Sequence, residues 1–403
     1  MRRNVVVTGM GVISPLGSDI ERYWEGLSSG RCAIKKREYK PAEDLSITVP
    51  TAAVEGFADR VAGLGREMAR TDRFTQLAIV AADEAIANAG VEFDDALGAR
   101  AAAIIGTGIG GQETSDNGYI GMLRKGRRPH PLSILKIITN APASHMTIRY
   151  GLRGPAFAIS SACATGAHCI GVCADLIRNG SADIGLAGAT EAVLSYGALE
   201  TWKAMHILAG ETCRPFSKNR NGLVIGEGAG VMVLEEEERA RKRGANILAR
   251  LAGFGMNADG KDMINPAVEG ASNAMRLALE GVVINDPSAV YINAHGTGTL
   301  MNDPTETKAI RNVFGAGADE LIVSSTKSMH GHLLGAAGGI ESIAAILALN
   351  NNMAPPTVNY DEPDPSCDLN YAPNAAQERK FDVAISNSFA FGGLNAVVVF
   401  EKV

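Results

Sequence analysis

The chain has 403 residues, of which 46% are hydrophobic and 20% charged, and its formal net charge is −6. This composition excludes a disordered chain, because so much apolar material can bury a large core. The negative charge argues against a protein that binds nucleic acid by neutralising phosphates, so we expect no nucleic-acid partner. The six cysteines show no framework spacing, which predicts reduced thiols in a cytoplasmic protein without disulfides.

No segment of the sequence predicts export or membrane insertion. The basic start contains Arg2 and Arg3 but lacks an apolar stretch long enough for a signal peptide. Residues 154–174 carry no formal charge, yet their Ser, Thr, His and Gly residues make a poor membrane span. No linker rich in Pro, Ser or charge divides the chain, so we expect one compact body of two halves.

Short apolar runs alternate with helical patterns along the chain, which favours an α/β fold built in stacked layers. In the first half, strands are predicted at 5–7, 101–105, 156–160, 184–187 and 231–234, and helices at 23–28, 73–89, 163–179 and 237–243. In the second half, strands are predicted at 247–256, 289–294, 321–325, 383–386 and 396–401, and helices at 270–279, 304–314 and 333–349. Residues 112–117 are polar and predict no helix.

The two halves repeat one pattern at a decisive place. A strand, a Ser-Ser pair, small residues and a long apolar helix occur around Cys163 and again around His332. Both helices are apolar on almost all sides, which predicts central and buried positions. A duplication that brings two equivalent helix N-termini together would place Cys163 opposite His332.

Cys163 is a candidate nucleophile because it stands where a strand-like stretch turns into a helix. The free N–H groups and dipole of a helix N-terminus stabilise a thiolate, so we expect a pKa below the usual ~8.5. The same N–H groups can hold an oxyanion when a thioester carbonyl is attacked. From position alone, Cys163 could equally be a buried core residue, as we expect for Cys169, Cys173 and His168.

The distant histidines and a Gly-rich loop each allow another interpretation, metal binding for the histidines and dinucleotide binding for the loop. His295, His330 and His332, with Asp303 nearby, could be metal ligands, but no further ligand occurs at a recognisable spacing, so we expect no metal. Residues 106–111 fit the dinucleotide pattern G-x-G-x-x-G. No strand with a terminal acid follows at the required distance, so we expect this loop to line a channel and expect no cofactor.

Five motifs, taken in order, carry a family resemblance over the whole chain: residues 5–17, 160–166, 293–299, 324–338 and 387–395. The sequence resembles a β-ketoacyl-acyl carrier protein synthase, the condensing enzyme of type II fatty acid and polyketide assembly. The resemblance implies a thiolase-like α/β fold with duplicated βαβαβαββ halves in a five-layer αβαβα arrangement. It also implies an N-terminal half (1–250) that carries the nucleophile and a C-terminal half (251–403) that carries the two histidines.

The resemblance assigns roles to six catalytic residues. Cys163 would accept an acyl group from acyl carrier protein, with the oxyanion held by the backbone N–H groups of Cys163 and Phe391. His295 and His332 would donate hydrogen bonds through Nε2 to the malonyl thioester oxygen while carbon dioxide departs. The remaining pair, Lys327 and Glu306, would interact with each other, and Lys327 would orient His332.

A second group is expected at the substrate gate and the acyl channel: Phe389, Ala390, Gly392, Thr297, Thr299, Ile109 and Trp202. Ala390 stands where the family usually has Gly, and Leu394 where it has Thr. Because Ala resists positive φ angles, we expect a stiffer gate loop. Trp202 is bulky for its place near the channel, which implies a changed acyl specificity. In the family Ile109 would close the pocket floor at a dimer interface.

The resemblance also implies partners. Basic residues that would face an acidic carrier protein at the channel mouth are Arg66, Arg70, Arg127, Arg128 and Lys203. The expected assembly is a homodimer that acts on acyl-acyl carrier protein and malonyl-acyl carrier protein. The alternatives are a secondary-metabolite synthase paired with a chain-length-factor homologue, a non-catalytic partner of that kind, and a metal-dependent hydrolase.

Overall fold

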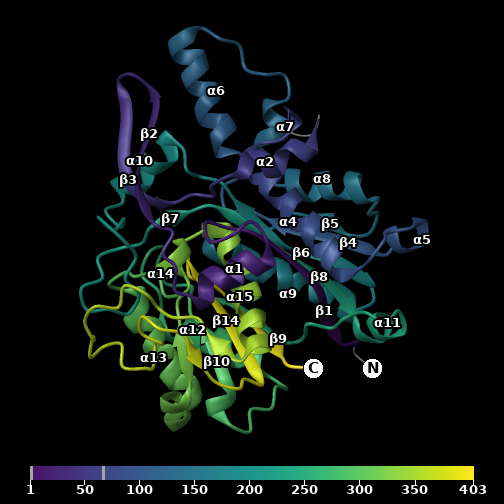
Figure 1. Cartoon of the computed structure of the whole chain (residues 1–403), viewed down its shortest axis with the longest axis vertical. Coiled ribbons are helices and arrows are strands. Elements are labelled where there is room, and N and C mark those ends of the chain that lie inside the picture. Colours follow the sequence, from purple (N-terminus) through teal and green to yellow (C-terminus); the bar gives the residue numbers. More distant parts are fainter. Residues whose placement is uncertain (1–2, 66–68) are drawn as a thin grey trace.

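A computed structural model describes residues 3–65 and 69–403 of the chain (Figure 1). Within these residues, ten strands form one mixed sheet in the order β11-β10-β14-β15-β9-β1-β8-β6-β4-β5. The strands of the first half are β1 (Val5–Ile13), β4 (Ala101–Gly106), β5 (Ala156–Phe157), β6 (Ile184–Glu191) and β8 (Gly228–Glu236). Those of the second half are β9 (Ala249–Ala258), β10 (Val290–Asn293), β11 (Ile322–Ser324), β14 (Val383–Ala390) and β15 (Leu394–Glu401). All ten predicted strands are confirmed, with shifted ends.

The two halves of the sheet have the same topology. The five strands of each half can be numbered first to fifth in chain order. Their order in the sheet, from the centre to the outer end, is then first, fifth, fourth, second and third in both halves. In both halves the second strand pairs in parallel with the third and fourth, and the fifth pairs antiparallel with the first and fourth. The halves meet where β1 and β9 pair antiparallel. The predicted internal duplication is therefore confirmed.

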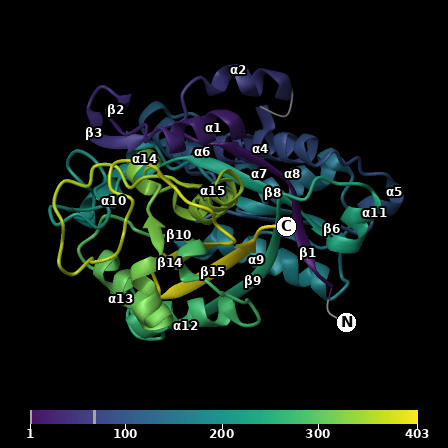
Figure 2. The ribbon, with the colours of Figure 1, turned by 60° about the horizontal axis from the view of Figure 1, so that its bottom comes forward.

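Helices complete a five-layer αβαβα arrangement, as predicted. Two long helices, α9 (Thr165–Arg178) and α15 (Ala337–Asn351), lie between the halves of the sheet and contact strands of both. The outer face of the first half is covered by α4 (Arg73–Ala89) and α8 (Ala141–Tyr150). On the opposite outer side, α12 (Val268–Leu279) lies on the strands and α13 (Asn302–Phe314) packs on α12 (Figure 2).

The two central helices cross at glycines. A Cβ atom added at Gly166 would lie 2.3 Å from the backbone nitrogen of Gly339, so only glycine lets the helices approach this closely. The helix N-termini therefore meet inside the molecule. Each is preceded by a short 3-10 turn, η2 (Ala162–Ala164) and η5 (Leu334–Ala336), and these two turns lie in contact.

The two turns have matching backbones. Ala162 has φ +48° and Leu334 has φ +46°, so each turn begins with a residue in the left-handed region that L side chains rarely adopt. The duplication thus makes Gly335 the counterpart of Cys163. His332 stands just ahead of the second turn and reaches across to the first.

Outside the layers lies a group of smaller elements: a hairpin of β2 (Lys35–Ala42) and β3 (Leu45–Ala52), with α6 (Gln112–Lys125), α7 (Ser133–Ile137) and α10 (Tyr196–Ala204). The prediction that residues 112–117 form no helix was wrong. Asp72 accepts the N–H of Thr114 over 2.7 Å, and Asp116 accepts the N–H of Gly197 over 2.7 Å, so tertiary anchoring outweighs weak helix propensity. The helix protrudes from the molecule with every side chain at least partly exposed (Figure 1).

The remaining elements are α1 (Ile20–Ser28), α2 (Phe57–Val61), α5 (Asp95–Gly98), β7 (Ile225–Gly226), α11 (Glu237–Lys242), α14 (Lys327–His330), β12 (Met353–Ala354) and β13 (Gln377–Glu378). Among the described residues, every helix is too short or too polar to cross a lipid bilayer.

Candidate active site

Three chemically active side chains meet where the central helices begin. The Sγ atom of Cys163 lies 3.0 Å from Nε2 of His332. The ring of His295 stands edge-on to that of His332, with 5.3 Å between the ring centroids. All three residues are buried. The structure therefore brings together the three side chains that the sequence places far apart.

Solvent exclusion controls the ionisation of the thiol. Burial raises the pKa of Cys163 to about 12, while the charge of Lys327 and the backbone N–H of Phe391 act in the opposite direction. The predicted lowering of this pKa by the helix terminus was wrong for the buried site, because desolvation of the thiolate outweighs the nearby donors. At neutral pH the thiol keeps its proton.

The backbone fixes the tautomer of His332. The N–H of Leu334 donates to Nδ1 of His332 over 3.1 Å, so the proton of the neutral ring sits on Nε2, the atom that faces Cys163. Burial lowers the pKa of His295 and His332 well below the usual value, and the charge of Lys327 acts in the same direction. Both rings are therefore neutral, and His332 presents a hydrogen-bond donor to the sulfur.

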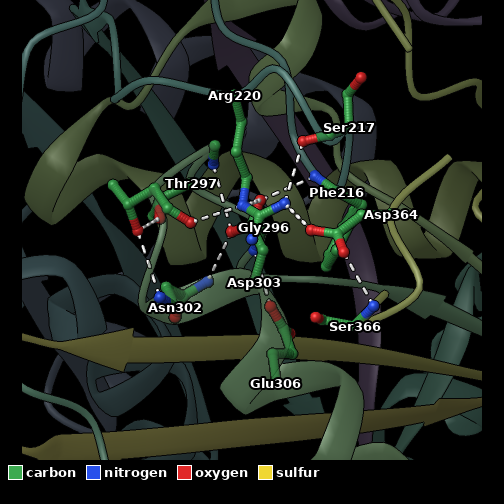
Figure 3. A network of polar contacts seen from close by, with 12 residues as sticks. Phe216, Ser217, Arg220, Gly296, Thr297, Asn302, Asp303, Glu306, Asp364 and Ser366 are labelled. Carbon is green, nitrogen blue, oxygen red and sulfur yellow. Dashed lines mark hydrogen bonds and ion pairs between the residues drawn. The ribbon is translucent and has the colours of Figure 1, made fainter. Parts of the chain in front are cut away.

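A buried carboxylate holds the turn that carries His295. Glu306 accepts the backbone N–H groups of His295 and Gly296, both over 2.8 Å, and Nδ2 of Asn387 over 3.1 Å. Figure 3 shows Glu306 next to this turn. Burial raises the pKa of Glu306 to about 7. Its contacts are all to uncharged donors, so it acts on the turn and not on a lysine.

The predicted pair of Lys327 and Glu306 is wrong, because Lys327 pairs with Glu341. Its Nζ lies 2.5 Å from Oε1 of Glu341, and both side chains are fully buried. Glu341 projects from the central helix α15, whereas Glu306 comes from the outer helix α13. The sequence did contain a signal for Glu341, since it is the lone charged residue in the apolar helical pattern 333–349.

Glu191 is a second buried carboxylate that the sequence analysis missed. It accepts the Thr107 hydroxyl over 2.8 Å, the N–H of Gly108 over 2.8 Å and the N–H of Gly335 over 3.0 Å. It thus joins the Gly-rich loop 106–111 to the turn beside His332. The amides of this loop are engaged within the protein, which argues against the dinucleotide interpretation of its glycines.

The segment after β14 brings two phenylalanines to the site. The Phe389 ring lies 6.1 Å from the His295 ring, and the Phe391 ring stacks on Trp202 with 6.4 Å between centroids. Positive φ angles occur at Gly392 and Gly393, whereas Ala390 ends β14 with an ordinary strand backbone. Ala390 therefore needs no positive φ in this conformation, and the stiffer gate loop stays a prediction.

A cavity of about 220 Å³ opens onto the three side chains. It is lined by Cys163, His295, His332, Phe389, Ala390 and Phe391, and also by Thr297, Thr299 and Trp202. Its lining further includes the exposed apolar side chains of Ile264, Leu300 and Met301. Ile109 is not among the described residues that line it; this side chain is 42% exposed on the surface of the single chain.

Four of the five predicted carrier-binding residues are described, and all four are exposed. Arg127 and Arg128 line a surface hollow of about 440 Å³ that also contains Thr71, the neighbour of Arg70. Lys203 follows Trp202 at the edge of the catalytic cavity. Arg66 lies outside the described residues.

The same three side chains could in principle hold a metal ion. Sγ of Cys163 and one ring nitrogen each of His295 and His332 lie within 4.8 Å of one another, and thiolate and imidazole are ligands that zinc prefers. The nearby cation of Lys327 opposes a dication, as shown by its effect on the pKa of both histidines. The carboxyl groups of Glu191 and Glu341 act on Cys163 in the opposite sense, so the geometry permits a metal and the surrounding charges partly cancel.

Comparisons with known proteins place this site in a family. The model of the β-ketoacyl synthase N-terminal domain matches residues 2–240, and that of the C-terminal domain matches residues 248–361. Nodulation protein E of Rhizobium sp. (strain N33) is 44% identical over 407 residues, with all of both chains covered. The 3-oxoacyl-[acyl-carrier-protein] synthase 2 of Staphylococcus aureus (strain N315) is 40% identical, covering 99% of this chain and 98% of its own.

A solved structure of the ishigamide ketosynthase/chain length factor is 33% identical, covers all of both chains and has a TM-score of 0.91. The two domain models together span most of the chain, and the relatives span all of it. The chain therefore belongs to the β-ketoacyl synthase family and is an acyltransferase that condenses an acyl group with malonyl-acyl carrier protein in fatty acid or polyketide chain elongation.

Proposed function

We propose that Cys163 is the nucleophile that carries the acyl chain. Its sulfur attacks the thioester carbonyl of an acyl-acyl carrier protein, and the carrier's thiol leaves with the proton lost by Cys163. The backbone N–H groups of Cys163 and Phe391 stabilise the oxyanion. The contact that carries this proposal is the 3.0 Å approach of His332 Nε2, a donor whose tautomer the backbone sets.

We propose that the two histidines act in the second half-reaction, on malonyl-acyl carrier protein. As neutral rings, His295 and His332 donate through Nε2 to the malonyl thioester oxygen and stabilise the enolate while carbon dioxide leaves. The enolate carbon then attacks the acyl-cysteine, which releases β-ketoacyl-acyl carrier protein and frees Cys163. Lys327 acts through the electrostatics of both rings, and Glu341 compensates its charge.

The substrate arm of the carrier is proposed to enter between Thr297 and Trp202, with the ring of Phe391 as the gate. Arg70, Arg127, Arg128 and Lys203 are proposed to recognise the acidic carrier surface. Exposure of all four side chains and the shared hollow beside Arg127 and Arg128 support this. The whole process is proposed to take place in the cytoplasm and without a resident cofactor.

A homodimer is the proposed assembly. The strand β5 stands at the end of the sheet with both residues exposed, and an exposed strand edge is a template for pairing with a second chain. The helices α6 and α7 of the same half expose several large apolar side chains, Tyr119, Leu123, Ile134 and Leu135. Pairing there would cover Ile109, which is proposed to close the acyl pocket at the interface.

A specialised pathway is the second candidate. The ishigamide ketosynthase/chain length factor is among the solved structures most similar to the chain, and four similar proteins are named Nodulation protein E. These relatives support the proposal that the chain is a secondary-metabolite synthase. In that case its partner would be a chain-length-factor homologue. Purification of the chain with and without such a homologue would separate a self-sufficient enzyme from one that condenses only in a heterodimer.

Intact-mass measurement of acyl loading tests the nucleophile and the substrate together. The chain is incubated with acyl carrier proteins that bear chains of different length and unsaturation, and the added mass identifies the preferred group. Cys163→Ala should gain no acyl mass, while the exposed-thiol control Cys32→Ser should load like the parent. Loading of Cys163→Ala, or an activity that depends on stoichiometric zinc, would overturn the proposal.

A further inference from the structure

Two adjoining loops form part of the lining of the catalytic cavity, one wall from each loop. One wall contains Asn221 and Gly222, and the other contains Thr297 and Thr299. The walls touch directly, because the N–H of Gly222 donates to the carbonyl of Gly298 over 3.0 Å. The contact between these two loops fixes the shape of this side of the cavity.

Arg220 joins the two walls a second time. It belongs to the first wall through its backbone, next to Asn221, and its side chain reaches the second (Figure 3). Its Nε donates to the carbonyl of Thr299 over 3.0 Å, and its Nη1 donates to the carbonyl of Ser217 over 3.0 Å. The side chain is only 4% exposed, so these are buried contacts of a full positive charge.

Two carboxylates hold the guanidinium from either side. Asp364 accepts from Nη1 over 2.5 Å, and Asp303 lies 4.0 Å from Nε. Asp303 also accepts the N–H of Gly298 in one wall, over 3.2 Å, and that of Phe216 in the loop leading to the other, over 2.7 Å. Figure 3 shows this arrangement. Arg220, Asp303 and Asp364 together form a buried clamp.

The clamp stands directly behind the polar groups that face the cavity. The hydroxyls of Thr297 and Thr299 lie 2.9 Å apart, and the Thr299 hydroxyl accepts the N–H of Asn302. The turn that presents them is held by Arg220 at the Thr299 carbonyl and by Asp303 at the Gly298 amide. Buried ion pairs add little net stability, so a role in fixing geometry explains their presence better.

We propose that Arg220 is a positioning residue for the condensation, which holds the two loops together and places the hydroxyls of Thr297 and Thr299 for the arm of a carrier-borne thioester. This inference rests on the proposed function. Because the clamp touches neither Cys163 nor a histidine, its effect should fall on recognition of the long arm and not on the reactivity of the thiol.

The test compares Arg220→Lys with the parent in three measurements. Lysine keeps the charge but cannot span Thr299, Ser217 and Asp364 together. We expect the KM for malonyl-acyl carrier protein to rise about tenfold, the size expected when a charged hydrogen bond is lost, with a much smaller change in kcat. Alkylation of Cys163 by iodoacetamide and loading from a short synthetic thioester should both stay within about twofold, because these small reagents bypass the arm contacts.

Two further variants keep the inference falsifiable. Asp364→Asn loosens Arg220 from outside the cavity and should raise the same KM in the same direction. Arg214→Lys is the matched control, because this arginine of the same loop pairs with Asp361 and Glu211 and should leave the KM unchanged. An unchanged KM in a folded Arg220→Lys, or an equal loss of alkylation, would overturn the clamp. A parent protein that loads no acyl group would instead overturn the proposed function.

Discussion

Three groups around the sulfur of Cys163 can stabilise its anion, the ring of His332, the backbone N–H of Phe391 and the charge of Lys327, while the carboxyl groups of Glu191 and Glu341 act in the opposite direction. Burial is the largest effect, and with these carboxyl groups it raises the pKa to about 12. In the resting site the thiol is therefore protonated, and it lies beside groups that would stabilise the thiolate. Such an arrangement favours the transition state of attack more than the resting anion.

Alkylation of Cys163 should therefore become faster with pH without levelling off in the neutral range. Because the raised pKa leaves only a small thiolate fraction, the rate should increase about tenfold per pH unit between about pH 6 and pH 9. Peptide mapping by mass spectrometry distinguishes Cys163 from the exposed Cys32. A plateau below pH 8 would show that the thiolate already dominates at neutral pH.

The buried pair of Lys327 and Glu341 should couple strongly in stability. Glu341→Gln leaves a buried cation without its partner and should cost about 3 kcal/mol in the free energy of unfolding, measured in urea. In a double-mutant cycle, Lys327→Met combined with Glu341→Gln should cost less than the sum of the single changes. The matched cycle with Glu306→Gln should show much weaker coupling; the reverse result would restore the pairing predicted from the sequence.

Among individual residues, the sequence identified the reactive side chains but not the residues that contact and orient them. Cys163, His295 and His332 stand in recognisable motifs, and the structure brings them together. Glu341 and Glu191 act through contacts with residues distant in sequence, across helix and loop crossings. Such contacts depend on three-dimensional packing, which residue spacing along the chain does not encode.

Among the elements, the crossing of α9 and α15 decides where the nucleophile lies. The helices approach at Gly166, Gly338 and Gly339, and this brings η2 and η5 into contact. Larger residues at the crossing would separate the turns and draw Cys163 away from His332. The small residues of both helices are therefore as much a part of the site as its polar groups.

Gly166→Ala tests this crossing. The new Cβ would meet backbone atoms that cannot move aside, so we expect a loss of more than about 2 kcal/mol in the free energy of unfolding and slower acyl loading. Gly118→Ala is the control in the exposed helix α6, where a Cβ meets nothing within 4 Å. There alanine should stabilise by about 0.5–1 kcal/mol. Equal effects of the two substitutions would contradict the role of the crossing.

The patterns that predicted the elements succeeded where burial was the cause. Apolar runs gave all ten strands of the large sheet, and the largely apolar segment 333–349 gave the central helix α15. They failed for α6, whose side chains are all at least partly exposed and whose first turns are held by Asp72 and by a contact to α10. An exposed helix leaves no apolar periodicity in the sequence.

For the molecule as a whole, the net negative charge opposes the binding of an acidic carrier protein. The chain has a net charge of −6, so an acidic carrier must be attracted by a local basic surface. Arg127→Ala combined with Arg128→Ala should raise the KM for carrier substrates severalfold at low ionic strength, with a smaller effect as salt is added. Arg22→Ala, an exposed arginine near Asp19, is the control and should change nothing. A salt-independent effect would point to a structural defect.

The duplication of the halves leaves one sheet end open in each, and the two ends differ. Among the described residues, β5 ends the sheet with both of its residues exposed, whereas β11 at the other end is buried, and the first half also carries the exposed apolar residues of α6 and α7. Leu123→Glu, at a side chain that is 80% exposed, should therefore weaken the proposed dimer at least tenfold in sedimentation experiments without unfolding the monomer. Val283→Asp changes a side chain beyond α12 that is 70% exposed and should leave the dimer intact. Because Ile109 would be covered by the same contact, the monomeric variant should also lose its preference among acyl chain lengths. A parent protein that sediments as a monomer and still discriminates chain length would contradict both the dimer and the role of Ile109.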